Sequence, residues 1–240
     1  MPWLHGKEAH TKRFIYLSLT IVSSALCSTA STCTSGTLAT YIGLGSGGCT
    51  IGQNTLYDFQ TVSGISGATP ISTADVSISP LGGNLNLGVT ASVSQVAGAN
   101  SQLELLFTYQ ISGASYVADS ITLGGSSETA DGAVTDIQNF CAGGVFGPDG
   151  VTGCTGLAGS LLTLDGVQNH DSTVLGAASS LGVTDDLTLD GGLMGSASGG
   201  TITDRFSAVP EPFSYLLTGL GLALGLAAKL TSVGRNRRKI

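Results

Sequence analysis

Residues 102–112 have the sequence QLELLFTYQIS, and the alternation within this stretch decides the fold class. Its apolar residues share one phase of a two-residue repeat: Leu103, Leu105, Phe107, Tyr109 and Ile111. The other phase holds Glu104, Thr108 and Gln110, with Leu106 as the exception. Successive side chains of a strand point to opposite faces, so this stretch predicts a β-strand with one buried face.

The same alternation recurs in residues 75–79, 84–94 and 186–190. Turn-forming pairs separate such stretches: Gly82-Gly83, Ser112-Gly113, Gly124-Gly125, Asp131-Gly132, Asp149-Gly150, Asp165-Gly166 and Asp190-Gly191. The sequence therefore predicts an all-β domain, an antiparallel sandwich or jelly roll of about 8–10 strands. A short helix is an alternative for residues 131–141, where Val134, Ile137, Gln138 and Cys141 recur at three- and four-residue spacing.

The charges are distributed unevenly along the 240 residues. Between positions 31 and 209, Arg205 is the single base against 14 acidic residues, and the other eight bases lie near the two ends. A region without a basic patch does not attract phosphates, which excludes nucleic-acid binding. The 36 glycines follow no three-residue period, which excludes a collagen-like fibre.

The first 30 residues have the three parts of a secretory signal peptide. Lys7, Lys12 and Arg13 precede an apolar run at 14–26, and small residues at 28–30 provide a cleavage site. As a helix this run is about 20 Å long, too short for a bilayer core of about 30 Å. We therefore expect export through the Sec translocon and removal of residues 1–30, with an uncleaved anchor as the alternative.

A second apolar run lies near the C-terminus, at residues 213–230. As a helix these residues are about 27 Å long, enough to span a membrane. A basic cluster follows and acts as a membrane stop: Arg235, Arg237, Arg238 and Lys239. Because such clusters stay in the cytoplasm, we expect a transmembrane helix that leaves residues 31–209 outside.

Val209-Pro210-Glu211-Pro212 stands directly before this run. A Pro-Glu-Pro motif, an apolar span and a basic end resemble, in that order, the PEP-CTERM sorting signal of Gram-negative bacteria that make exopolysaccharide. The resemblance implies recognition and processing by an exosortase; the alternative is an ordinary anchor. We thus divide the chain into a signal peptide (1–30), an exported β domain (31–207) and a sorting signal (208–240, with the basic tail at 235–239).

Four cysteines remain after the signal peptide: Cys33, Cys49, Cys141 and Cys154. An even number in an oxidising compartment predicts disulfides. Of three possible pairings we expect Cys33 with Cys49 and Cys141 with Cys154, each closing a loop of about 15 residues and stabilising the fold by roughly 3 kcal/mol. Free thiols or a metal site are the alternatives, but the chain has no CxxC for zinc. Residues 33–59 also resemble the opening of uncharacterised PEP-CTERM proteins.

The sequence contains no strong catalytic or cofactor-binding motif. Residues 43–48 match G-x-G-x-x-G, but the sequence after them does not begin a helix, so we expect a loop. His170 is the single histidine after the leader and lies in a polar turn, without a G-x-S-x-G elbow. A pair of glycosidase carboxylates stays open among the 14 acids, but this region has no Trp to build a sugar cleft. We predict no catalytic residue and no enzyme.

Calcium is the one cofactor considered. Several acids lie in or near Gly-rich turns where oxygen ligands can converge: Asp149, Asp165, Asp185, Asp186 and Asp190. The alternative is that these residues form turns.

We expect a non-enzymatic exported protein, first anchored in the inner membrane and then placed in the cell envelope or extracellular matrix. Its role would be structural or adhesive in an exopolysaccharide matrix. The expected partners are exosortase, the Sec translocon, the membrane and polysaccharide. A carbohydrate-binding module is the alternative, and a secreted hydrolase the less favoured one.

Overall fold

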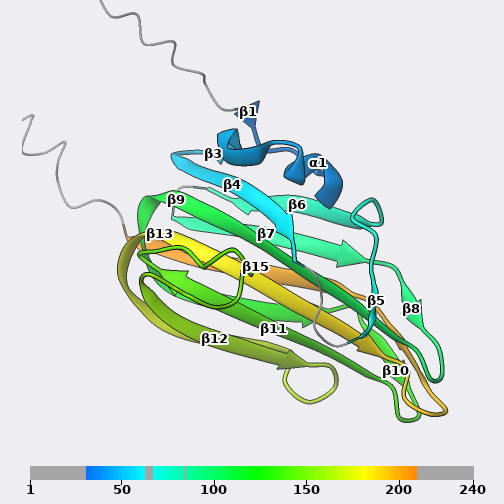
Figure 1. Cartoon of the computed structure of the whole chain (residues 1–240). Helices are drawn as coiled ribbons and strands as arrows, with labels where there is room; N and C mark the ends of the chain where they lie inside the picture. The colour runs from blue at the N-terminus through cyan, green and yellow to red at the C-terminus, as the bar shows by residue number, and fades with distance from the viewer. Residues whose placement is uncertain (1–30, 63–66, 84, 210–240) are drawn as a thin grey trace, which may run out of the picture.

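The computed structural model describes residues 31–62, 67–83 and 85–209 (Figure 1). The long strands are β4 (Asn54–Thr61), β6 (Val76–Gly82), β7 (Asn86–Val93), β9 (Gln102–Gly124), β11 (Ala133–Ala142), β12 (Leu157–Leu164), β13 (His170–Asp190) and β15 (Thr201–Val209). The short elements are β1 (Ser31–Thr32), β2 (Gly36–Thr37), α1 (Leu38–Ile42), the 3-10 turn η1 (Gly45–Gly47), β3 (Cys49–Ile51), β5 (Thr69–Pro70), β8 (Val96–Ala97), β10 (Ser127–Thr129) and β14 (Ser196–Ser198). The described part of the chain is thus all-β with one short α-helix, as the alternation predicted.

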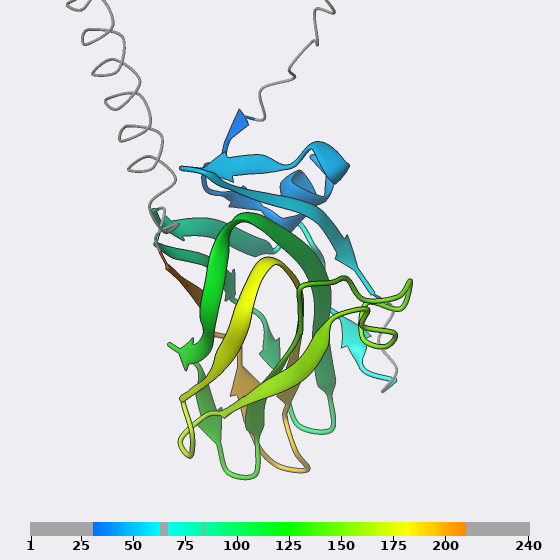
Figure 2. The same ribbon diagram turned by 90° about the vertical axis from the view of Figure 1, so that its left-hand side faces the viewer.

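Twelve of these strands form one large sheet, and β10, β14 and β8 form a separate sheet of three. Most neighbours are antiparallel; β1 with β3 and β5 with β9 are parallel. The 23-residue β9 and the 21-residue β13 pair along most of their lengths and run through the middle of the sheet. Figure 2 shows the sheet curling around its interior as a half-barrel.

This curled sheet differs from the two-layered sandwich or jelly roll that we expected. The difference arises in the two long strands, which bend instead of ending: β9 continues through the Ser112-Gly113 turn signal, and β13 follows it. Gly113 has φ 131° within β9, and the pairing of β13 with β9 changes register between Val174 and Ser180. Bulges of this kind increase the local twist and let one sheet curl upon itself.

The predicted alternation along β9 is confirmed. Leu105, Phe107, Tyr109 and Ile111 are fully buried inside the half-barrel. Leu106 is also buried, although it points to the outer face. Val62 and Ile71 lie over it there, and the Val62 amide donates to the Leu106 carbonyl. Both faces of this part of β9 are therefore covered, which explains why Leu106 breaks the pattern.

The helix considered for residues 131–141 is wrong. This segment is strand β11, which pairs with β12 on one side and β13 on the other. Val134, Asp136, Gln138 and Phe140 all point into the half-barrel and are buried. Two of these inward residues are polar, so the hydrophobic alternation of the strand is hidden and a helical spacing remains visible.

The only α-helix among the described residues, α1, was not predicted. Thr37 caps its N-terminus, where the hydroxyl accepts from the Thr40 amide at 3.2 Å. No helix in the described ranges is long and apolar enough to cross a membrane. The expected signal helix (1–30) and the transmembrane helix (213–230) lie outside the described residues.

Candidate functional site

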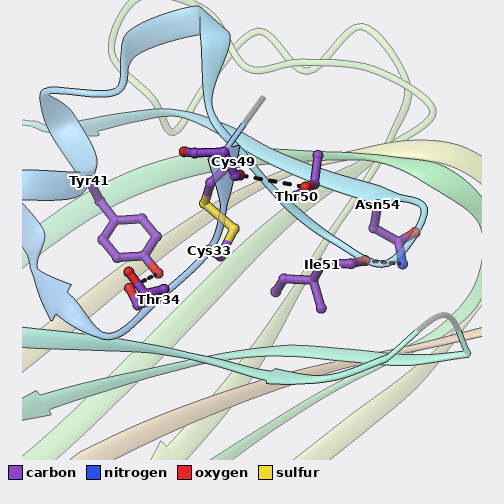
Figure 3. The surroundings of a disulfide bond; sticks show 8 residues. Cys33, Thr34, Tyr41, Cys49, Thr50, Ile51 and Asn54 are labelled. Atoms are coloured by element: carbon purple, nitrogen blue, oxygen red, sulfur yellow. Dashed lines mark hydrogen bonds between the residues drawn. A yellow bond between two sulfur atoms is a disulfide. The ribbon is translucent and has the colours of Figure 1, made fainter. Parts of the chain in front are cut away.

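Two disulfides are present, in the near-neighbour pairing that we expected. Cys33 and Cys49 fasten β1 and the chain after it to β3, with Cα atoms 4.9 Å apart (Figure 3). The Cys33 amide donates to the Thr50 carbonyl, and the Tyr41 hydroxyl donates to the Thr34 carbonyl at 3.0 Å (Figure 3). This disulfide therefore anchors the N-terminal segment onto the main sheet.

The second disulfide joins Cys141 to Cys154 and closes the loop between β11 and β12. This loop, residues 143–153, folds back over the outer face of β13 and β9. The Thr184 hydroxyl donates to the Gly150 carbonyl, and an added Cβ at Gly150 would lie 2.8 Å from Val62. The Phe146 ring lies against Gly182, where an added Cβ would be 3.4 Å from the ring. The loop is thus seated on the sheet at both of these glycines.

Between this loop and β4 lies an open groove of about 650 Å³. Its lining combines carboxylate, carboxamide and hydroxyl groups with one aromatic ring: Asp58, Gln60, Thr61, Val62, Thr108, Gln110, Phe146, Gly147, Pro148, Asp149, Gly150 and Gly182. Thr108 and Gln110 come from the outer face of β9 and form the floor. Asp58 and Gln60 come from β4, and Phe146 and Asp149 come from the disulfide-closed loop.

A β-bulge places Asp58 in the groove. Tyr57 pairs with Gln110 and Gln60 pairs with Thr108, so Asp58 and Phe59 together oppose Tyr109. Asp58 has φ 53°, a left-handed conformation that non-glycine residues rarely adopt. The bulge sends Phe59 into the core, where its ring stacks on Tyr109 at 5.0 Å, while Asp58 stays at the groove. Such backbone strain is concentrated at functional sites in many proteins.

The two groove carboxylates have different roles. Asp149 accepts hydrogen bonds from the amides of Val151 and Thr152 and from the Thr152 hydroxyl, and these donors lower its pKa. Its carboxylate is therefore used in shaping the loop. The Asp58 side chain has no hydrogen bond within the described ranges and is half-buried, so it can meet a ligand.

A second polar feature lies inside the half-barrel. Four aspartates from different strand segments are at most 1% exposed there: Asp119 of β9, Asp136 of β11, Asp185 of β13 and Asp204 of β15. We call these four residues the buried acidic cluster. The Tyr109 hydroxyl donates to Oδ2 of Asp204 at 2.5 Å. The other carboxylate oxygens of the cluster have no donor with good hydrogen-bond geometry in the described structure, although the Asp185 and Asp204 carboxyls interact with each other and the Ser120 amide lowers the pKa of Asp119.

Burial raises the pKa of every carboxyl in this cluster, because an ion loses its hydration there. Burial raises the pKa of Asp204 to about 7. The hydrogen bond from the Tyr109 hydroxyl acts in the opposite direction and keeps this pKa from rising further. The negative charge of Asp204 raises the pKa values of Asp119, Asp136 and Asp185 further. Arg205, the single base between positions 31 and 209, is exposed on the opposite face of β15 and does not offset these charges.

The five acids considered for calcium do not come together. Asp149, Asp165 and Asp190 each accept a backbone amide in their own turns, from Thr152, Gly166 and Gly192. Asp185 points into the half-barrel, and Asp186 points outward from the same strand. Over residues 31–62, 67–83 and 85–209, no three Asp, Glu, His or Cys side chains are placed to hold one metal ion.

The remaining motifs have ordinary positions. Residues 43–48 form a loop with η1 before Cys49, as expected. His170 begins β13, exposed, with Nδ1 3.1 Å from the Thr122 hydroxyl. Val209 is the exposed last residue of β15. The rest of the sorting motif (Pro210, Glu211, Pro212) and the basic tail (Arg235, Arg237, Arg238, Lys239) lie outside the described residues.

The sequence predicted neither the groove nor the buried acidic cluster. The groove joins residues from β4, β9 and the loop after β11, whose contact depends on the curl of the sheet. The cluster had a local signal: Asp204 lies two residues from both Ile202 and Phe206, and Asp119 lies two from Ile121. An aspartate in the apolar phase of a strand is therefore the sign of a buried acid.

Comparisons with known proteins give little similarity. No protein-family model and no curated protein sequence matches the chain. One solved structure that resembles it is the glycosylation associate protein (Gap123) complex from Streptococcus agalactiae, with 14% sequence identity and a TM-score of 0.27. That match covers 67% of this chain and 27% of the other.

Proposed function

We propose that the chain is a non-enzymatic adhesive protein of the bacterial surface, which holds polysaccharide in the groove between β4 and the disulfide-closed loop. The observation that carries this proposal is the groove itself, an open depression of about 650 Å³ lined mainly by polar side chains. A ligand site is typically concave and already formed before the ligand binds.

The groove offers the contacts that a sugar needs. The Gln60 and Gln110 amides can donate to and accept from sugar hydroxyls, and the Asp58 carboxylate can accept from them. The Phe146 ring provides an apolar surface for the C–H groups of a sugar ring. A β-sheet floor and a loop closed by a disulfide keep these groups in place, which limits the entropy lost on binding.

The charge of the domain favours a class of polysaccharide. Residues 31–209 contain 14 acids and one base, and the groove lining contains Asp58 and Asp149 but no base. An anionic polysaccharide would be repelled by this field. The expected ligand is therefore a neutral polysaccharide or one that carries amino groups.

Export and sorting complete the proposal. Two disulfides support folding in an oxidising compartment. Strand β15 ends at Val209, so the Pro-Glu-Pro motif follows the last strand directly. We place the protein first in the inner membrane by its C-terminal segment and then, after exosortase processing, in the cell envelope or the exopolysaccharide matrix.

The test is retention of the mature protein on immobilised polysaccharides of neutral, amino and sulfated types. We expect retention on one of the first two and none on the sulfated type. Phe146→Ala should abolish retention, whereas Val174→Ala, at an exposed apolar residue outside the groove, should leave it unchanged. Loss of retention in both variants or in neither would contradict the groove assignment. Release of reducing ends from the retained polysaccharide would instead indicate a hydrolase.

A further inference from the structure

We infer that the buried acidic cluster is a proton-binding site, which keeps the exported domain tightly folded in acidic surroundings and loosens it as the surroundings become alkaline. This inference is independent of the proposed adhesion, because it concerns the interior of the half-barrel and not the groove.

The register of the strands brings the four acids together. Asp204 pairs with Ile121, and Phe206 with Asp119, so Asp119 and Asp204 are diagonal neighbours on β9 and β15. Gln138 pairs with Asp185, which makes Asp136 and Asp185 diagonal neighbours on β11 and β13. Tyr109 contacts Asp204 from the first half of β9. The acids therefore form two pairs on different parts of the curled sheet, and the interaction of the Asp185 and Asp204 carboxyls joins the pairs.

No positive charge faces this cluster from the surrounding strands that the structure describes. Strand β7 presents Leu87, Val89 and Ala91 to the interior, and β12 presents Leu161 and Thr163. The titratable groups that face it are its own four carboxyls and Tyr109 of β9. Asp186, on the outer face of β13, adds negative charge near Asp136, and Glu104 of β9 in turn acts on Asp186. Four ionised carboxylates in such an interior would cost far more than a fold can supply.

Two neutral side chains in the interior also lack hydrogen-bond partners. Thr163 pairs with Asp136 and Gln138 with Asp185, and both side chains are fully buried in the same interior. The Gln138 oxygen and nitrogen and the Thr163 hydroxyl have no hydrogen-bond partner within the described part of the chain. Including seven carboxylate oxygens, the interior thus contains many acceptors and few donors. An ionised carboxylate only accepts, whereas a protonated one also donates, so bound protons would supply the missing donors.

The effect on stability follows from linkage. The pKa of Asp204 is about 7 in the folded chain against 3.8 for an unperturbed aspartate, and the other three are also raised. At pH values between the unfolded and the folded pKa, the folded state therefore binds more protons than the unfolded state. The contribution of the cluster to stability is fully present below about pH 4 and is lost as the pH rises through about 7. In ordinary acid denaturation the dependence is the opposite, because stability is lost as the pH falls.

The experiment is thermal unfolding of the protein as isolated from its host, in mild detergent, from pH 4.5 to 8.5. We expect the melting temperature to fall as the pH rises. Asp204→Asn cannot ionise, so it should raise the melting temperature at pH 8 and flatten the profile. The exposed Glu128→Gln should keep the wild-type slope. A wild-type profile that is flat or rises with pH would overturn the inference.

Two further measurements keep the test decisive. If Asp204→Asn does not fold, Asp185→Asn replaces it, because both residues belong to the cluster. The infrared C=O stretch of a protonated carboxyl should be present in the wild-type protein at pH 6 and decrease as the pH is raised to 8.5. Calcium added at pH 8 should not raise the melting temperature. A calcium-induced increase that abolishes the pH dependence would show a cation in place of the protons.

Discussion

The Tyr109 hydroxyl lies 2.5 Å from Oδ2 of Asp204 inside the half-barrel, although 95 positions separate the two residues in the sequence. The bond crosses the interior from the first half of β9 to β15, at a place where these two segments are not paired. The Asp204 carboxyl also interacts with the carboxyl of Asp185, on β13. The two residues therefore join the aromatic part of the core to its acidic part.

Removing this donor should cost stability. Tyr109→Phe leaves the ring in place and leaves Asp204 without its hydrogen bond, which we expect to destabilise the fold by about 1–3 kcal/mol. Because the Tyr109 hydroxyl lowers the pKa of Asp204, its removal should also extend the pH-dependent loss of stability to higher pH. Urea unfolding at several pH values measures both effects. Tyr57→Phe, at a half-buried tyrosine outside the cluster, is the control, and equal effects in the two variants would refute this prediction.

The strained Asp58 should show a conflict between stability and binding. Asp58→Gly removes a side chain from a left-handed position, so we expect a gain of about 0.5–1 kcal/mol in the free energy of unfolding. The same change removes a groove carboxylate and should weaken polysaccharide binding. Ala130→Gly is the matched control, because Ala130 has φ 50° and lies outside the groove. It should gain stability without losing affinity, and a lower affinity in this control would contradict the assignment.

Removing either disulfide should lower stability, but only removal of the one between Cys141 and Cys154 should weaken polysaccharide binding. Replacing Cys141 and Cys154 by serine should cost roughly 3 kcal/mol of stability and also loosen the groove wall, so binding falls. Replacing Cys33 and Cys49 should cost a similar amount but leave binding unchanged, because that bond fastens the N-terminal segment. Denaturation curves together with binding isotherms measure the two effects. Binding that survives the first replacement and fails after the second would reverse the roles assigned here.

If the proposed sorting is right, processing of the C-terminus should depend on the sorting motif. Replacing Pro210, Glu211 and Pro212 by alanine should leave an unprocessed, membrane-held form, because the motif is the proposed exosortase recognition element. The intact mass of the protein from its native host measures this outcome. The unaltered protein should have a mass near that of residues 31–210, and reduction of its two disulfides should add four hydrogens. An unaltered protein that still carries residues 213–240 would identify a plain anchor.

The sequence predicted the strands more readily than their arrangement. In β9, the apolar phase from Leu103 to Ile111 is visible because its inward residues are all apolar. In β11, the inward Asp136 and Gln138 hid the same repeat and left a false helical spacing. The curl of the sheet could not be predicted, because it depends on the bend at Gly113 and the bulges near Ala178.

Neither the groove nor the buried acidic cluster could be predicted from the sequence. Cysteine spacing was enough to pair Cys141 with Cys154, since near neighbours close short loops. Nothing local, however, indicates that Phe146 lies near Asp58, because the two meet only when the loop after β11 folds over β9. The buried acids had a visible signal in Asp204, but its significance depends on knowing which phase of β15 faces inward.

One calorimetric titration measures whether the groove binds polysaccharide. The mature protein is titrated calorimetrically with the polysaccharide that retains it, alongside Phe146→Ala/Gln110→Ala and the control Val174→Ala/Gln168→Ala. Truncating each groove side chain should weaken binding by about 1–2 kcal/mol, so the first double variant should bind roughly 30-fold more weakly or worse. The control should bind like the wild type. A groove variant with wild-type affinity would contradict the account.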